Sequence, residues 1–514
     1  MRITNSMMIN NSLANIAVNK NQLSILDTQR STEKKINRPS EDPIIAIRAL
    51  RLRSSLNEVT QYLTKNIPDA NSWMKIIQGA LEEGEKVLGD LYEYCNQGST
   101  DSYSSEERAT LAKSLQKLKL TYYDQGNVDY AGRYVFSGYR TDSRLTFPSE
   151  EEADNFSYSI TQGLSADNFD TKFVYKNPID VTDLESYVNS TAAIPDVDRD
   201  KVYRMRLAYS DTSADVIPKL EYGTGAGATD VSTIYNISVT HDSNAIPADN
   251  EILYNPDNGE MIFGETAYLN VRNQENLHVT YEKTNFDKDD VKPEHYFTCV
   301  RTDRAEKAVK EAMGETYVPI TYNEELAQDN YAMYDKELEY MINFSQRIRV
   351  NSSASQCFNI YLGRDIDDLS DSVTAVQDIE TAQAKVKEMQ ASPRYANDEA
   401  AQERLALLSD ALSKQFDLAS DSMQETYDAR ITSIQKYQKE NLHEQADIGN
   451  RIQRVELNME RLTEQQTNFK ELKSENEDIV LEDVLINYYS AELVYNASIS
   501  AASKVVRQSL LDFL

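Results

Sequence analysis

Apolar side chains recur at alternating steps of four and three residues over a long stretch of the N-terminal part of the chain. The series begins at Ile45, ends at Leu91 and is interrupted only by Asn66 and Gly84. This heptad spacing predicts one long helix with a continuous apolar seam. At about 1.5 Å per residue the helix would extend about 70 Å, which is more than one compact core can cover. We therefore expect long helical partners, and a bend at Pro68, because proline interrupts the hydrogen bonds of a helix interior.

Both ends of the chain carry apolar patterns that can supply these partners. An amphipathic spacing precedes the seam, another seam runs from Ile452 to Phe469, and the segment after Asp478 carries two adjacent apolar stripes. A helix that is apolar on two sides needs two neighbours, which favours packing between subunits. Since one stripe would lie in water in a free subunit, we expect residues 1–37 and 478–514 to be disordered until assembly. The predicted assembly interface consists of Leu13, Ile16, Leu23, Leu26, Val480, Val484, Leu485, Val494, Tyr495, Val505, Val506, Leu510 and Leu511.

A short polar segment separates the N-terminal helix from the long seam. We predict a rigid structural corner formed by Asn37, Pro39, Ser40, Asp42 and Pro43. Pro39 blocks the preceding helix, whereas Pro43 suits the first position of the next one. The residue before a proline is pushed out of the helical conformation. Asp42 is therefore expected to be an N-cap whose carboxylate accepts hydrogen bonds from the first free N–H groups.

From about residue 141 to about residue 335 the heptads give way to alternating apolar and polar residues between turn-forming clusters. Runs such as KVYRMRLAYS and TIYNISVTH are typical of strands. Asn258-Gly259 lies between two apolar runs and predicts a hairpin turn with positive φ at both residues. A further hairpin is expected within residues 339–361. The whole layout predicts an α+β protein in which both termini form a helical bundle, and we expect its β-rich insert to fold alone.

Charge narrows the classes of partner. The chain of 514 residues has a formal net charge of −31. This charge argues against nucleic acid or an anionic membrane as a partner. Residues 141–300 hold 29 acidic and 12 basic side chains, a net of −17, whereas residues 1–60 hold 9 basic and 5 acidic side chains, a net of +4. No cleavable signal peptide is recognisable, and no apolar run approaches the ~20 residues that a membrane helix needs. General secretion rules alone would place the protein in the cytoplasm.

Motifs that could indicate an enzyme are weak. GTGAGA at residues 223–228 fits a dinucleotide-binding loop, but a strand rather than a helix is expected after it, which favours a flexible turn. Asp196, Asp198 and Asp200 have the first spacing of a calcium loop, yet the required glycine and glutamate are missing, which favours a solvated acidic loop. The four histidines and three cysteines are isolated in sequence. We therefore predict no enzyme, no cofactor and no catalytic, cofactor-binding or metal site.

Several segments outside the insert have a familiar form. They are MRITNSMM at the start, NRPSEDPIIA at the corner, GRYVFSGYRTD from Gly132, RIRVNSSASQCF and the ending QSLLDFL. Together they resemble the flagellar hook-associated protein 3 family, the hook–filament junction proteins related to flagellin. The resemblance covers about residues 1–139 and 338–514 and leaves the insert unmatched. Glu33 stands where the family commonly has glycine, so we expect the first helix to continue toward Asn37 here.

The resemblance implies a domain layout. A flagellin-like fold would place an N-terminal helical assembly arm at residues 1–42 and a C-terminal one at residues 476–514. Residues 43–140 and 336–475 would form the helical bundle core with its β-hairpin, and residues 141–335 a β-rich variable insert. The corner would redirect the chain between the N-terminal arm and the core.

The resemblance also implies a function. The chain would be a structural subunit of the bacterial flagellum, an adaptor between the hook-associated proteins and flagellin, secreted through the flagellar type III export apparatus and therefore extracellular. Implied partners are further copies in the axial ring, a junction protein of the hook-associated protein 1 type, flagellin and a cytoplasmic export chaperone. Two alternatives stay open: a flagellin of the filament itself, or a surface adhesin or glycan-binding module carried on an axial scaffold.

Overall fold

The computed structural model describes residues 5–100, 103–223, 227–324 and 337–511. The chain divides into two compact units. Unit 1 takes in residues 1–71, 340–348 and 453–514, and unit 2 takes in residues 72–339 and 349–452. Both ends of the chain therefore belong to unit 1, together with the short middle segment 340–348, and the rest of the chain belongs to unit 2.

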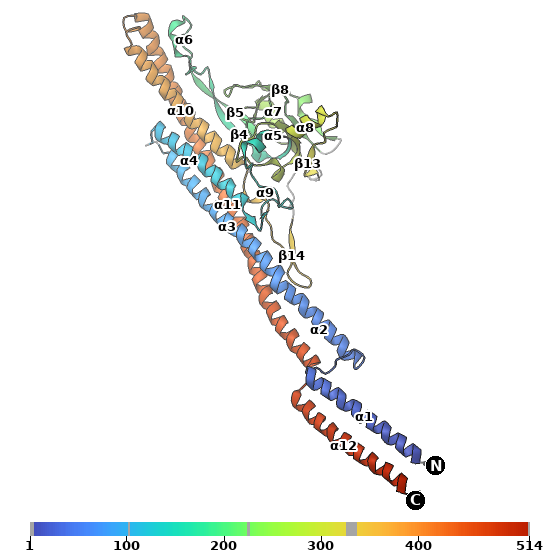
Figure 1. Ribbon diagram of the computed structural model, residues 1–514. Helices are drawn as coiled ribbons and strands as arrows, with labels where there is room; N and C mark the ends of the chain where they lie inside the picture. Colours follow the sequence, from blue (N-terminus) through green and yellow to red (C-terminus); the bar gives the residue numbers. More distant parts are fainter. Residues whose placement is uncertain (1–4, 101–102, 224–226, 325–336, 512–514) are drawn as a thin grey trace. The chain divides into compact units, whose positions relative to one another are not determined.

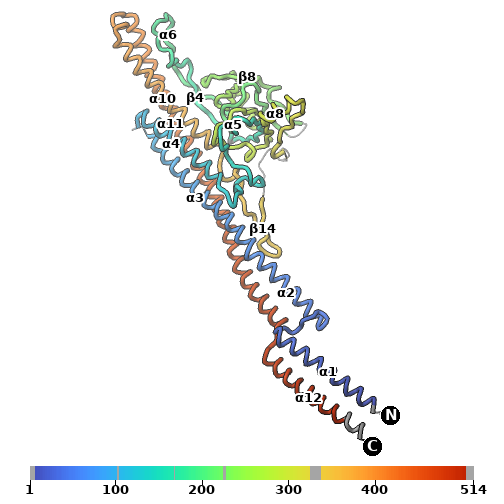
Figure 2. The backbone as a smooth tube through the Cα atoms, viewed as in Figure 1, coloured from blue at the N-terminus to red at the C-terminus, as the bar shows by residue number. Residues whose placement is uncertain are grey.

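Unit 1 is built from helices contributed by both ends of the chain. The N-terminal and C-terminal helices lie side by side (Figures 1 and 2). The predicted terminal helices are confirmed. In their described parts, residues 5–32 and 481–511, both arms are helical in a single chain, contrary to the expected disorder, and the two helices pack against each other. The elements are α1 (Asn5–Thr32), α2 (Pro43–Gln61), the π-helical turn η1 (Tyr62–Asn66), the start of α3 (Ile67–Gly98), the end of α11 (Glu399–Glu477) and α12 (Leu481–Leu511).

The predicted heptad seam is confirmed. Its members are buried or half-buried throughout, with Val59 and Trp73 among the fully buried ones. A bend was expected at Pro68; just before it the structure has the π-helical turn η1, in which the Ile67 N–H donates to the Tyr62 carbonyl. This wider turn comes directly before a residue that has no N–H to donate, and it lets the helix continue into α3.

The helical part of unit 2 is formed by α3, α4 (Ser105–Asp124), α10 (Tyr361–Ala391) and α11, with the short α9 (Ala354–Cys357). A capping box starts α4. There the Ser104 N–H donates to Glu107 Oε2 at 2.9 Å, and the Glu107 N–H donates to Ser104 Oγ at 3.3 Å. α4 packs against α10 (Figure 1).

Unit 2 also holds two sheets. One sheet has the strand order β4-β5-β10-β9-β8 and the other β13-β12-β3-β11-β6-β7. Every neighbouring pair is antiparallel except β8 and β9, which are parallel. The strands are β3 (Phe156–Leu164), β4 (Phe169–Lys176), β5 (Asp198–Arg206), β6 (Lys219–Tyr222), β7 (Thr229–Asp230), β8 (Asn236–Val239), β9 (Glu251–Asn255), β10 (Glu260–Phe263), β11 (Leu277–Lys283), β12 (Thr298–Asp303) and β13 (Ile320–Tyr322). Short helices accompany them: α5 (Glu150–Asn155), α6 (Leu184–Asn189), α7 (Glu265–Val271) and α8 (Arg304–Ala312).

Two expected hairpins differ in detail from the structure. Asn255 pairs with Glu260, so the turn between β9 and β10 has four residues, and within it φ is positive only at Gly259 (+56°). A Cβ on Gly259 would lie 1.9 Å from the Tyr209 carbonyl oxygen, so glycine is required there for space as well as for φ. The later hairpin is shorter than expected, since its strands are β14 (Glu339–Met341) and β15 (Arg347–Arg349). β1 (Asp129–Tyr130) and β2 (Arg133–Tyr134) form a further small hairpin.

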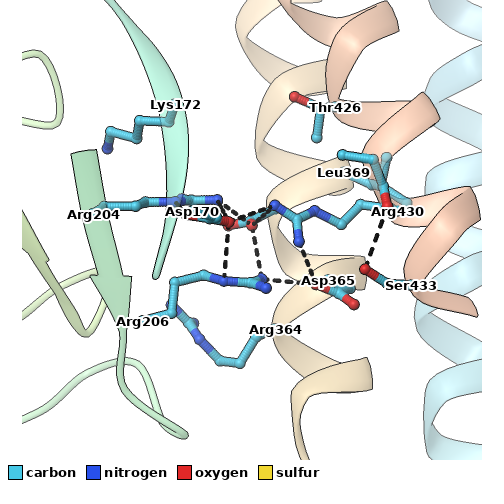
Figure 3. Close-up of polar contacts among 12 residues, drawn as sticks. Asp170, Lys172, Arg204, Arg206, Arg364, Asp365, Leu369, Thr426, Arg430 and Ser433 are labelled. Carbon is cyan, nitrogen blue, oxygen red and sulfur yellow. Dashed lines mark hydrogen bonds and ion pairs between the residues drawn. The ribbon is translucent and has the colours of Figure 1, made fainter. Parts of the chain in front are cut away.

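Buried charges join the first sheet to the helices of unit 2 (Figure 3). Arg204 Nη2 on β5 lies 2.8 Å from Asp368 Oδ2 on α10, and Arg206 Nη1 lies 2.7 Å from Asp365 Oδ1. Arg430 on α11 also contacts Asp365, at 2.7 Å. Burial alone would raise the pKa of the Asp368 carboxyl, but the arginines, Arg204 foremost, outweigh it and hold that pKa far below its usual range.

These ion pairs count against the expectation that the insert folds alone. The Asp365 side chain is fully buried and that of Arg204 is 8% exposed, so separating the sheet from the helices would leave charged groups without partners. A hydrogen bond also connects the insert to the segment that precedes α10, since Tyr296 Oη donates to the Phe358 carbonyl at 2.8 Å. The insert belongs to the same compact unit as the helices that it contacts.

Candidate assembly interface

The predicted corner has the local geometry that its sequence requires. Asp42 has an extended backbone, and its Oδ1 accepts from the N–H groups of Ile44 at 2.9 Å and Ile45 at 3.1 Å. The predicted N-cap is therefore confirmed, with Pro43 in the first helical turn. Asn37, Pro39 and Ser40 are exposed, and the Asn37 N–H donates to Glu41 Oε2 at 2.8 Å.

A second segment of the chain is hydrogen-bonded to the residues that precede the corner. The Lys35 N–H donates to the Glu477 carbonyl at 2.7 Å, and the Ile479 N–H donates to the Glu33 carbonyl at 3.1 Å. Lys34 forms an ion pair with Asp478. Hydrogen bonds from Lys34 and then from Ser474 lower the pKa of the Asp478 carboxyl. The connection from α1 to α2 and the connection from α11 to α12 are thus held together within unit 1.

The Glu477 side chain anchors this junction to α2. Its carboxylate is 5% exposed and accepts two hydrogen bonds from the Arg53 guanidinium, Nε to Oε1 at 2.8 Å and Nη2 to Oε2 at 2.7 Å. The pKa of the Arg53 guanidinium is raised, chiefly by the hydrogen bond to Glu477 and secondly by the negative charge of that carboxylate. Such a bidentate ion pair fixes the orientation of both side chains.

Glu33 ends the first helix, contrary to the expectation that the helix continues toward Asn37. α1 stops at Thr32, and Glu33 has φ +57°. This left-handed conformation turns the chain so that the Glu33 carbonyl can accept from Ile479. A left-handed residue after the last helical turn is the usual C-terminal motif and favours glycine. The position therefore keeps the geometry for which glycine is suited, although glutamate occupies it.

α1 and α12 form an antiparallel pair. Asn19 Nδ2 donates to Ser498 Oγ at 2.8 Å, and the Arg30 guanidinium lies 4.7 Å from the centre of the Tyr488 ring. Residues further along α1 thus meet residues earlier in α12, which is the signature of an antiparallel arrangement. The start of α1 and the later part of α12 lie at the same end of the pair (Figure 1).

The predicted interface residues fall into three groups. Ile16, Leu23 and Leu26 on α1, with Leu485 and Tyr495 on α12, are half-buried, and Val484 is buried. Leu13, Val480 and Val494 are 57%, 61% and 50% exposed. The side chains of Val505, Val506, Leu510 and Leu511 lie outside the described residues. One stripe is therefore satisfied within the chain, while other members remain in water.

Sequence reasoning missed the most exposed apolar side chains of the arms. On α12, Ile486, Tyr489 and Leu493 are 65%, 64% and 73% exposed. Their spacing of three and four residues places them on one side of the helix. On α1, Val18 and Ile25 are 64% and 43% exposed and are seven residues apart. The heptad interval was visible in the sequence, but which stripe would turn inward depends on the partner helix.

The weak enzyme motifs gain no support from the described part of the chain. Residues 224–226 of the glycine-rich motif lie outside the described residues, and the strand β7 follows the motif. Asp198 and Asp200 belong to strand β5, and Asp200 pairs with Lys176 at 2.7 Å. Among the described residues, no group of three or more His, Cys, Asp or Glu side chains could hold a metal ion. A search of those same residues finds no helix long and apolar enough to cross a membrane.

Comparison with known proteins identifies relatives of this chain. Residues 3–141 match the family model of the bacterial flagellin N-terminal helical region. The flagellar hook-associated protein 3 of Salmonella typhimurium is 28% identical over 145 residues, which are 28% of this chain and 45% of that protein. The protein of the same name from Escherichia coli is 29% identical over 153 residues, 30% of this chain and 47% of that protein. The resemblance to hook-associated protein 3 is therefore confirmed.

A solved structure also aligns with this chain. The flagellar hook associated protein-3 of Legionella pneumophila aligns with a TM-score of 0.28 and 11% identity, covering 82% of this chain and 96% of that one. The matched segments span less than half the length of the two curated relatives.

Proposed function

We propose that this chain, which carries a flagellin N-terminal helical region, is a structural subunit of the bacterial flagellum and acts as an adaptor at the junction of hook and filament. Its role would be to bind a hook-associated protein on one side and to offer flagellin a surface on the other. It would have no catalytic activity. It would be extracellular after secretion by the flagellar export apparatus.

The exposed apolar stripe of the arms carries this proposal. Ile486, Tyr489 and Leu493 remain largely in water although α1 already covers the other side of α12. Exposing several large apolar side chains in one row costs free energy at about 25 cal/mol per Å² until a partner covers them. A helix pair with one satisfied and one unsatisfied side is suited to packing against equivalent pairs of other subunits.

The junction near the corner supports a subunit that must present a fixed surface. The Asp42 cap, the hydrogen bond from Lys35 to Glu477 and the Arg53–Glu477 pair hold the two connections of unit 1 together. Each subunit of a symmetric assembly must make the same contacts, so a defined junction between arm and core is an advantage. We infer that the predicted corner residues serve this purpose.

The proposed partners follow from the same surfaces. We infer further copies of the chain in an axial ring, a hook-associated junction protein and flagellin as partners of the arms. A cytoplasmic chaperone would cover the apolar stripe of α12 before export. Neither nucleic acid nor membrane is proposed as a partner, because the chain carries a net charge of −31.

Flagellin itself is the second candidate, since the matched family model is that of the flagellin N-terminal region. The two functions differ in copy number, because a filament subunit is present in far more copies than a junction ring. The resemblance of the corner and of the GRYVFSGYRTD segment to hook-associated protein 3 favours the junction.

Deleting the gene in the bacterium that encodes the chain tests the proposal. We expect cells that keep their hooks, lose their filaments and release flagellin into the medium, with restoration by the intact gene. Loss of flagellin synthesis, or filaments of normal length on the deletion strain, would contradict the proposed function.

A further inference from the structure

α2 presents an apolar and basic surface on the side away from its packing seam. Ile44, Ile47 and Leu50 are 71%, 54% and 64% exposed. Arg48 and Arg51 lie among them and are exposed. Neither arginine has an ion-pair partner in the part of the chain that the structure describes. We call these five residues the α2 patch.

α11 presents an acidic surface within the same unit. Leu457 is 67% exposed, and Glu460, Glu464 and Glu471 are also exposed. Their spacing puts all four on one side of the helix, which we call the α11 ridge. Within the described residues these glutamates have no ion-pair partner. Residues 453–478 hold 7 acidic and 4 basic side chains, a net of −3, against a net of +4 for residues 1–60.

The patch and the ridge cannot meet in one molecule. α2 and the end of α11 pack along a shared seam, where Asn476 Nδ2 donates to the Ile45 carbonyl at 3.2 Å and Gln466 Nε2 donates to Thr60 Oγ1 at 3.0 Å. Helical spacing places each surface on the side of its helix opposite this seam. The two surfaces therefore face in opposite directions, away from each other.

We propose that the α2 patch of one copy binds the α11 ridge of the next copy. Leucine and isoleucine side chains would pack on Leu457, and the two arginines would pair with the glutamates of the ridge. Contact between two different surfaces of the same chain is heterologous, and repeating it produces a ring or a helical filament. The inference rests on the proposed function for its biological setting, but the contact itself can be tested with purified protein.

Cysteine trapping tests the contact directly. Two full-length variants, Leu50→Cys and Leu457→Cys, are mixed and oxidised, with the unmodified chain as a background control because Cys95, Cys299 and Cys357 are buried. We expect the disulfide between unlike variants to exceed either like pair at least tenfold, and 0.5 M salt to reduce it because the charges are screened. No trapped pair above background, or equal amounts of like and unlike pairs, would overturn the proposal.

Charge reversal provides the matched test. Adding Arg48→Glu and Arg51→Glu to the Leu50→Cys chain should lower the yield of the unlike pair at least fivefold. Adding Glu460→Arg and Glu464→Arg to the other chain should then restore it to within about twofold. The control variant Lys113→Glu with Lys117→Glu reverses two exposed charges on α4 and should leave the yield unchanged. A loss that the compensating change does not restore would contradict the pairing.

The two proposals fail in different ways. If the disulfide pair forms in solution but deleting the gene causes no filament defect, the contact is supported and the proposed function is wrong. If deleting the gene causes a filament defect but no disulfide pair forms, the proposed function is supported and the contact is wrong.

Discussion

Arg53 on α2 and Glu477 at the end of α11 are 424 positions apart in sequence and form two hydrogen bonds of 2.8 and 2.7 Å. The carbonyl of the same glutamate accepts the Lys35 N–H. Glu477 therefore contacts the start of the core and the connection that follows the N-terminal arm. This single residue links the two ends of the chain at the point where the arms leave the core.

Removing the arginine should loosen this junction. In Arg53→Met the Glu477 carboxylate stays buried but loses both hydrogen bonds. We expect unit 1 to lose about 1–2 kcal/mol, a figure reduced because the arginine itself is 54% exposed. Hydrogen exchange at the Lys35 and Ile479 amides should become about tenfold faster. Lys86→Met, which removes an exposed pair with Glu83, is the control, and equal exchange in both variants would contradict the account.

The N-cap predicts a local loss of helix stability. Asp42→Ala removes an acceptor for two N–H groups, and such a loss typically costs about 1 kcal/mol. Exchange of the Ile44 and Ile45 amides should accelerate severalfold, whereas Asp42→Asn should keep most of the protection. Protection in the alanine variant that equals that of the unmodified chain would show that the cap contributes nothing.

Glu33 predicts a stabilising substitution. A residue other than glycine pays about 1–2 kcal/mol for the left-handed conformation that Glu33 adopts at φ +57°. Glu33→Gly should therefore raise the stability of unit 1 by about 1 kcal/mol, net of the entropy lost by glycine on folding. Glu33→Ala is the matched control and should bring no gain. The stabilities of the two variants are compared by denaturant unfolding. A glycine variant that is no more stable than the alanine variant would count against the left-handed conformation assigned to Glu33.

His295 predicts a pH dependence for unit 2. Burial, only partly offset by Glu294, lowers the pKa of His295 to about 4, against about 6.5 in an unfolded chain. As pH falls below 6.5 the unfolded chain binds the proton first, so folding stability should fall between pH 6.5 and pH 4, by about 2–3 kcal/mol. His295→Gln should remove this part of the slope, and His241→Gln, at a side chain 63% exposed, should not. Identical slopes in all three proteins would refute the prediction.

The exposed side of α12 that carries Ile486, Tyr489 and Leu493 leads us to expect that folding and assembly can be separated by mutation. Ile486→Glu and Leu493→Glu change side chains that already lie in water, so helix content should be unchanged and the stability of the monomer should stay within about 0.5 kcal/mol of the unmodified chain. Incorporation into flagella should be lost, because a charge would be buried at the subunit contact. Val484→Glu, at a buried position facing the interior, should instead destabilise the monomer. If Leu493→Glu is incorporated normally, these exposed residues are not part of the subunit interface.

Local patterns were the part of this structure that sequence could predict. The heptad seam, the Asp42 cap and the helices of both termini follow from interactions between residues close together in the chain. The left-handed Glu33 was missed because the hydrogen bond that accompanies this conformation comes from Ile479, far away in sequence. The ion pairs between the insert and the helices were missed for the same reason, since Arg204 meets Asp368 only in the folded chain. The candidate interface was identified as a set of stripes, but the side of α12 that stays in water depends on where α1 packs.

The most direct test of the central claim is the position of the protein on the flagellum. Isolated flagella are labelled with a gold-conjugated antibody against the purified chain and viewed by electron microscopy. The label should appear as one narrow band between hook and filament. The same preparation from a deletion strain is the control. Labelling along the whole filament would identify a flagellin instead, and labelling elsewhere on the cell with none on the flagellum would contradict the account.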